Sequence, residues 1–159
     1  MAVLSTHSSF MSTTPAMNSL EELQIKLACS ELIIRAVSCA DKHDARGFAD
    51  CFALDASLSR PGGQPIVGRE AIFATYAQRP AERLTRHLIT NTLLDIVSAQ
   101  QVKAVSYAMV VAGSNNDELT PKGRKASSCQ IGEFHDTLVL SNEGWKIQTR
   151  DASFTLYLP

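Results

Sequence analysis

A histidine stands inside a segment whose composition is typical of a half-buried strand, RLTRHLITN at residues 83–91. Imidazole exchanges a proton readily near neutral pH, so His87 could act as a general base on a ligand held beside this strand. The same residue could instead be structural, with its ring hydrogen-bonded to backbone at the start of the strand. The role depends on whether another side chain meets the ring.

The carboxylate that could meet His87 is Asp41, at the end of a long predicted helix. The run LEELQIKLACSELIIRAVSCAD, residues 20–41, contains no glycine or proline and follows an Asn-Ser pair that can cap a helix. Steps of seven residues trace an apolar stripe through Leu20, Leu27 and Ile34, and the next step reaches Asp41. We expect this stripe to face the core and to bring Asp41 with it, in need of a partner. The alternative is a solvated aspartate in the last helical turn.

Contact between these two side chains would create a definite chemistry. A carboxylate that accepts a hydrogen bond from Nδ1–H of His87 fixes the tautomer of the ring and leaves Nε2 free to take a proton. Asp41 would also stabilise the imidazolium that forms. The pair would then be a general base that works near neutral pH.

Two further polar residues lie within predicted strands. Side chains alternate along a strand, so His87, Ile89, Asn91 and Leu93 are expected to share one face. Arg150 lies in the last strand run, where its guanidinium could hold an anionic or polarised oxygen, and a surface arginine is the alternative. We expect Asn91 and Arg150 to steady negative charge that develops on a substrate.

The rest of the chain predicts the elements that would position these residues. Residues 43–60 are typical of a short second helix followed by an edge strand, and residues 68–79 of a third helix that ends before Pro80. Runs rich in β-branched and aromatic residues follow at 85–97, 101–113, 127–141 and 144–158. Helices followed by a meander of strands predict an α+β fold, in which helices cover one face of a curved antiparallel sheet.

Composition and charge argue against several classes of partner. The 159-residue chain carries 15 basic and 16 acidic residues, a formal net charge of −1, which gives no reason to expect nucleic acid or an anionic membrane. No apolar run reaches the roughly 18 residues that a membrane span needs. We interpret two short basic clusters as solvated edges rather than binding patches: Arg79, Arg83 and Arg86, and Lys122, Arg124 and Lys125.

The sequence also lacks motifs for cofactors and metals. Its four cysteines match neither a CxxC redox motif nor the paired spacing of a zinc site. No P-loop, GxGxxG, GxSxG or HExxH motif occurs. We expect no metal and no cofactor, a disordered tail at residues 1–18, a single domain at residues 19–159, and a cytoplasmic location.

Five ordered stretches resemble the SnoaL-like branch of the nuclear transport factor 2-like superfamily: AVSCADKHDARGFADCFALDA, GREAIFATY, RHLITN, AVSYAMVV and GEFHDTLVLSNEGWKIQTRD. The resemblance covers about residues 20 to 152, nearly the whole predicted domain. It implies a cone-shaped fold, in which a curved, mostly antiparallel sheet wraps around about three helices and encloses a pocket.

Within this superfamily the chain is similar to scytalone dehydratases and lindane-type dehydrochlorinases. In those enzymes an aspartate at the end of the first helix orients a histidine, which implies these roles for Asp41 and His87. In the dehydrochlorinases an arginine follows the tryptophan of the final hairpin, and Arg150 corresponds to it. The chain departs from them at Ala40, where the dehydratases have tyrosine, and at Ala36, where the dehydrochlorinases have lysine; it also lacks the dehydratases' second histidine. The pocket-lining positions implied by the similarity are Leu58, Ala108, Val110 and Phe134.

We therefore expect a cofactor-independent, dehydratase-like lyase or an isomerase, in which Asp41 and His87 act on a small apolar molecule in a hydrophobic pocket. Two alternatives stay open: a ligand-binding module of the same fold without chemistry, and a structural subunit of a larger oxygenase. A curved sheet with apolar residues on both faces also predicts self-association, as a homodimer or homotrimer.

Overall fold

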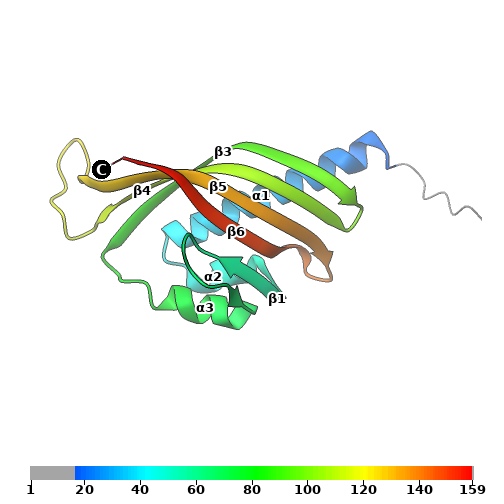
Figure 1. Ribbon diagram of the computed structural model, residues 1–159, viewed down its shortest axis with the longest axis horizontal. Coiled ribbons are helices and arrows are strands. Elements are labelled where there is room, and N and C mark those ends of the chain that lie inside the picture. Colours follow the sequence, from blue (N-terminus) through cyan, green and yellow to red (C-terminus); the bar gives the residue numbers. More distant parts are fainter. Residues whose placement is uncertain (1–16, 159) are drawn as a thin grey trace, which may run out of the picture.

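Four long strands in the C-terminal half of the chain pair in sequence order within one curved sheet (Figure 1). The computed structural model describes residues 17–158 and gives these strands as β3 (Arg83–Ser98), β4 (Gln101–Ser114), β5 (Ala126–Ser141) and β6 (Gly144–Leu158). β6 also pairs in parallel with β1 (Phe52–Ser59), and β1 pairs with the short β2 (Ile66–Val67). The sheet order is β2-β1-β6-β5-β4-β3, so β1 is not the edge strand that the sequence predicts.

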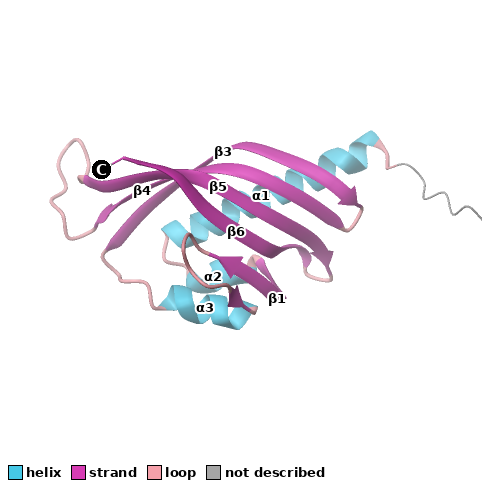
Figure 2. Ribbon diagram, viewed as in Figure 1, coloured by secondary structure: helices cyan, strands magenta, loops and turns pink. Residues whose placement is uncertain are grey.

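Three helices gather on one side of this sheet (Figure 2): α1 (Ser19–Asp41), α2 (Ala45–Asp50) and α3 (Arg69–Ala77). Asn18 caps α1, because its side chain accepts a hydrogen bond of 2.9 Å from the backbone N–H of Glu21. The predicted α+β class and the cone-shaped arrangement are confirmed. The predicted N-terminal tail lies outside the described residues up to residue 16.

Helix α1 turns a different face to the core from the one the sequence predicts. The stripe of Leu20, Leu27 and Ile34 is exposed, with 66%, 62% and 57% of each residue open to solvent. The prediction is wrong because α1 carries apolar residues on both faces, and spacing alone does not choose between them. The buried face of α1 contains Ile25, Cys29, Leu32, Ile33, Ala36, Val37 and Ala40.

A β-bulge in β3 changes which side chains face the helices. Thr90 pairs with Tyr107 and Leu93 with Val105, so β3 holds one more residue than β4 between these pairs. Asn91 occupies the bulge with a φ of 51°, and its side chain is exposed. The prediction that Asn91 and Leu93 share a face with His87 is therefore wrong, because the extra residue resets the alternation.

Within residues 17–158, no helix combines the length and the apolar character needed to cross a bilayer.

Candidate active site

The last residue of α1 and the first part of β3 meet in a tight polar contact. Asp41 Oδ1 lies 2.6 Å from Nδ1 of His87 and accepts a hydrogen bond of 2.8 Å from the Thr85 hydroxyl. Asp41 Oδ2 accepts a further bond of 2.8 Å from the backbone N–H of His87. Only 12% of the Asp41 side chain and 14% of the His87 side chain are exposed. The structure thus brings together the two residues that the sequence singles out.

These hydrogen bonds keep the carboxylate ionised. Burial on its own would raise the pKa of Asp41, but the bonds from the ring and backbone of His87 and from Thr85 lower it below its ordinary value. An ionised carboxylate only accepts hydrogen bonds, so Nδ1 of His87 carries the proton in this contact. In the neutral imidazole the lone pair then lies on Nε2, and Nε2 makes no hydrogen bond to any residue that the structure describes.

His87 forms part of the wall of a cavity of about 190 Å³. This volume is somewhat larger than the roughly 150 Å³ of an apolar cavity that takes up benzene. The interior is apolar and buried, and it is lined by Leu58, Val110 and Phe134 together with Val37, Ala40 and Phe48. Ala108 is buried behind this lining, against Val37 and Phe134, and Asn91 is outside the cavity altogether. The cavity is suited to a ligand of one substituted ring, or of two small rings.

Arg150 lines the same cavity, but it is already paired. Its Nε and Nη2 donate hydrogen bonds of 2.8 and 2.7 Å to the two carboxylate oxygens of Asp136, its direct neighbour across β5 and β6. Its guanidinium carbon lies 4.6 Å from the centre of the Phe134 ring. Burial would lower the pKa of Arg150, but the Asp136 carboxylate raises it. Nη1, which makes no hydrogen bond within residues 17–158, is the part of Arg150 left for a ligand.

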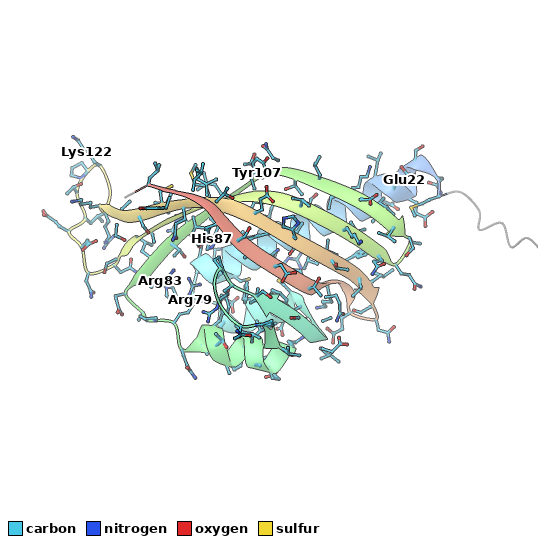
Figure 3. All side chains as sticks on the ribbon, viewed as in Figure 1. Glu22, Arg79, Arg83, His87, Tyr107 and Lys122 are labelled. Carbon is cyan, nitrogen blue, oxygen red and sulfur yellow. The ribbon has the colours of Figure 1, made fainter. Side chains whose placement is uncertain are left out.

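Tyr76 and three further arginines line the cavity, although the sequence did not identify them as site residues. Tyr76, on α3, stacks on Phe48 with ring centres 3.9 Å apart. Arg60, Arg79 and Arg83 come from the segments that follow β1, follow α3 and begin β3. Figure 3 shows Arg79, Arg83 and His87 in one region, with Tyr107 apart from them. Arg79 and Arg83, interpreted from the sequence as solvated edges, both line the cavity; Arg79 is half-buried and Arg83 is exposed.

The Tyr76 hydroxyl is a hydrogen-bond donor at this site. Burial raises the pKa of Tyr76, and the charges of the surrounding arginines only partly oppose this effect. The phenol is therefore neutral at physiological pH. The spacing of Ile72 and Tyr76, one helical turn apart on the buried side of α3, was the signal in the sequence that could have identified it.

Metal ligands and reactive thiols do not gather around this cavity. Across residues 17–158, no group of three or more His, Cys, Asp or Glu side chains is arranged to hold a metal ion. The four cysteines are free. Burial raises the pKa of Cys29 to about 12 and that of Cys51 to about 11, which keeps both thiols neutral and unreactive.

Comparison with solved structures finds the same fold in a dehydrochlorinase, in a candidate dehydratase and in a protein of unknown function. A candidate scytalone dehydratase from Novosphingobium aromaticivorans matches with a TM-score of 0.77 and 19% identity, over 89% of this chain and 91% of that one. A type 2 hexachlorocyclohexane dehydrochlorinase, LinA, matches with a TM-score of 0.75 and 17% identity, over 89% and 93%. The protein of unknown function, from Mycobacterium tuberculosis, matches with a TM-score of 0.70 and 25% identity, over 88% and 78%.

Sequence comparison assigns the family directly. No curated protein matches the chain. The family model described as a SnoaL-like domain matches residues 21–151, a segment that contains Asp41, His87 and every residue that lines the cavity except Ala152 and Phe154. The chain therefore belongs to the SnoaL-like domain family, and it has the nuclear transport factor 2-like fold.

Proposed function

We propose that this protein is a cofactor-independent lyase or isomerase in which His87 is the general base. The observation that carries the proposal is the contact between Asp41 and His87 at the wall of an apolar cavity, with Nε2 of the ring left free. A base that is oriented by a carboxylate and placed beside a ligand-sized cavity is the arrangement that proton abstraction needs. The fold is shared with a dehydrochlorinase and a candidate dehydratase, which supports the same class of reaction.

The chemistry assigns one step to each group. Nε2 of His87 takes a proton from a carbon of the bound ligand, and Asp41 stabilises the imidazolium. In an elimination, the electron pair of the broken C–H bond forms a double bond while a hydroxide or halide leaves with its own electron pair. In an isomerisation, the imidazolium returns the proton to a different carbon. The Tyr76 hydroxyl and Nη1 of Arg150 stabilise negative charge that builds up on oxygen.

A ligand-binding module of the same fold would hold a molecule in this cavity without changing it. The two functions differ in whether C–H bonds of the bound ligand break. A measurement on the wild-type protein can decide between them before the natural substrate is known.

The wild-type protein is expected to exchange carbon-bound hydrogen of suitable ligands with solvent. Cyclic ketones, with or without a hydroxyl or chloride on the carbon β to the carbonyl, would be incubated with the protein in deuterium oxide and followed by proton NMR. We expect loss of the signal of the acidic C–H, or new alkene signals, above the rate in buffer. A ligand that binds, as shown by saturation transfer from the protein, and keeps all its C–H signals would support the binding module instead.

We also propose that the protein self-associates as a homodimer or homotrimer. The face of the sheet opposite His87 exposes apolar residues, with Leu88, Leu93 and Tyr107 exposed by 52%, 74% and 45%. A second copy of the chain that packs on this face would remove them from water.

Light scattering after gel filtration is expected to give the mass of two or three chains, and Leu93→Asp is expected to shift it toward one. The control is Leu119→Asp, which changes a residue of similar exposure, 66%, in the loop between β4 and β5. A wild-type protein that runs at the mass of one chain would contradict self-association.

A cytoplasmic location is part of the same proposal. Its support is the set of four free cysteines, because the reducing conditions of that compartment keep thiols from pairing.

A further inference from the structure

Four arginines line the cavity, and no aspartate or glutamate does. They come from four separate parts of the chain: Arg60 follows β1, Arg79 follows α3, Arg83 begins β3 and Arg150 lies in β6. All four line the same cavity as Tyr76, and their charges lower the pKa of Tyr76 against the larger effect of its burial. Arg60 and Arg83 are exposed, Arg79 is half-buried and Arg150 is buried. The cavity thus has an apolar interior and cationic groups that extend from its wall to its exposed rim.

The other three arginines differ from Arg150 in their pairing. Asp136 neutralises Arg150 through two hydrogen bonds. Arg60, Arg79 and Arg83 make no ion pair with any carboxylate of residues 17–158. Arg79 donates one hydrogen bond, of 3.1 Å, to the carbonyl oxygen of Ala40.

Arg79 is the most constrained member of this group. It is half-buried, and its guanidinium carbon lies 5.2 Å from the centre of the Tyr76 ring. Burial lowers the pKa of Arg79, and the charges of Arg83 and Arg60 lower it further, while Tyr76 and Asp41 act in the opposite direction. Like charges held together near a low-dielectric cavity destabilise one another, and a bound anion would relieve that repulsion.

We propose that the cavity binds an organic carboxylate whose apolar ring fills the interior and whose carboxylate is held by Arg79 and Arg83, with Arg60 at the entrance. This inference deepens the proposed function by naming the class of substrate, and it rests on that function only in calling the ligand a substrate. It differs from the expectation of a small apolar molecule in giving the ligand one charged group.

The shape and the chemistry of the site favour this ligand over other anions. A guanidinium forms two parallel hydrogen bonds to a carboxylate, and here two guanidinium groups are available to one ligand. An inorganic anion would leave the apolar interior of Leu58, Val110 and Phe134 empty. A neutral apolar ligand would fill the interior and leave the arginines without a counter-charge. An aromatic or alicyclic carboxylate satisfies both parts of the site.

A cationic entrance would also assist the proposed reaction. Removal of a proton from carbon adds a second negative charge to a ligand that already carries one. Positive groups that are fixed in place before the reaction stabilise this added charge without reorganising. The arginines would therefore contribute to the rate as well as to binding.

The test compares two probes of equal shape, 2-naphthoate and its neutral amide 2-naphthamide, by isothermal titration calorimetry on the full-length protein. Wild type is expected to bind naphthoate at least tenfold more tightly than naphthamide, because hydrogen bonds between charged partners are the strong ones. Arg79→Gln is expected to weaken naphthoate binding on the order of tenfold, and Arg83→Gln severalfold, with naphthamide binding unchanged. Equal affinities of wild type for the two probes would overturn the proposal.

One further variant, and the comparison of Arg83→Gln with Arg79→Gln, guard against misreading this result. Arg86→Gln is the matched control, because Arg86 lies on the same strand as Arg83 but outside the lining of the cavity. The affinity of this variant for naphthoate should equal that of wild type. Arg79 also donates a hydrogen bond to the end of α1, so Arg79→Gln removes both a charge and a structural contact. The Arg83 side chain makes no hydrogen bond to the described residues, so Arg83→Gln tests the effect of the charge alone. An unchanged naphthoate affinity in both Arg79→Gln and Arg83→Gln would contradict the inference.

The outcome is independent of whether His87 is catalytic. His87→Gln leaves the three unpaired arginines in place, so it is expected to retain the preference for naphthoate even if it abolishes turnover. A protein that prefers naphthoate but never exchanges C–H bonds would keep this inference and refute the proposed function. Rising salt should weaken the binding of naphthoate and leave that of naphthamide unchanged.

Discussion

His87→Ala is expected to lower the rate of hydrogen exchange or elimination on any responsive ligand by on the order of 10²- to 10⁴-fold, the usual contribution of a positioned general base. The effect should fall on kcat, because the imidazole acts on the proton in transfer and contributes little to holding the ligand. The rate would be followed by proton NMR, with affinity measured separately by calorimetry.

Two controls make this result specific. His135→Ala removes a histidine of similar strand context whose side chain is 54% exposed and paired with Glu133, and it should leave the rate unchanged. Added imidazole should restore part of the activity of His87→Ala, since the vacated space adjoins the cavity, and it should not affect wild type. A His87→Ala protein that is folded and fully active would remove His87 from the mechanism.

Asp41 should behave as part of the same unit. Asp41→Asn removes the charge that stabilises the imidazolium, and the amide can present its N–H₂ group to Nδ1 and favour the wrong tautomer. If the two residues act together, the double variant with His87→Ala should be no slower than His87→Ala alone. Additive losses would indicate two independent roles.

Asp136→Ala is expected to destabilise the fold by about 3–5 kcal/mol, the usual consequence of leaving one partner of a buried ion pair without the other. Only 4% of the Arg150 side chain and 1% of the Asp136 side chain are exposed, so the variant leaves a buried guanidinium without its counter-charge. Urea denaturation followed by circular dichroism would measure the change in the free energy of unfolding. A decrease in the free energy of unfolding as small as that expected for an exposed ion pair would show that Arg150 finds another partner.

The matched comparison is the exposed pair of Arg46 and Glu70. It has the same two-bond geometry, at 2.8 and 2.9 Å, but both residues face solvent. Glu70→Ala should therefore change the free energy of unfolding far less than Asp136→Ala, because water solvates the remaining arginine. Replacing Asp136 and Arg150 together by Leu and Met should recover much of the lost stability, since no buried charge then remains.

The sequence could predict the helices, the strands and the approach of Asp41 to His87, because these depend on local patterns and on a resemblance that fixes their order. It could not predict which face of α1 is buried, because apolar residues occupy both faces of that helix and only packing against the sheet selects one. The pairing of Asp136 with Arg150 depends on the register of β5 against β6, which alternation along each strand does not set.

The group of arginines that lines the cavity was the feature hardest to predict from the sequence. Arg79 and Arg83 lie four positions apart in a short basic cluster, and such clusters are usually solvated. Their role becomes visible only when Arg60 and Arg150 are brought to the same cavity by β1 and β6. A charged site assembled from distant segments leaves no local pattern in the chain.

The bulge in β3 has a consequence for how this scaffold can change over evolutionary time. Asn91 is the extra residue, so its deletion would return Thr90 and Leu93 to regular alternation and leave every inward side chain of β3 facing inward. Bulges bend a strand and increase its local twist, so such a deletion would flatten the sheet where it curves over α1. A lineage could thus alter the curvature of the cone, and with it the room for a ligand, by gaining or losing one residue while every group that touches the ligand is inherited unchanged.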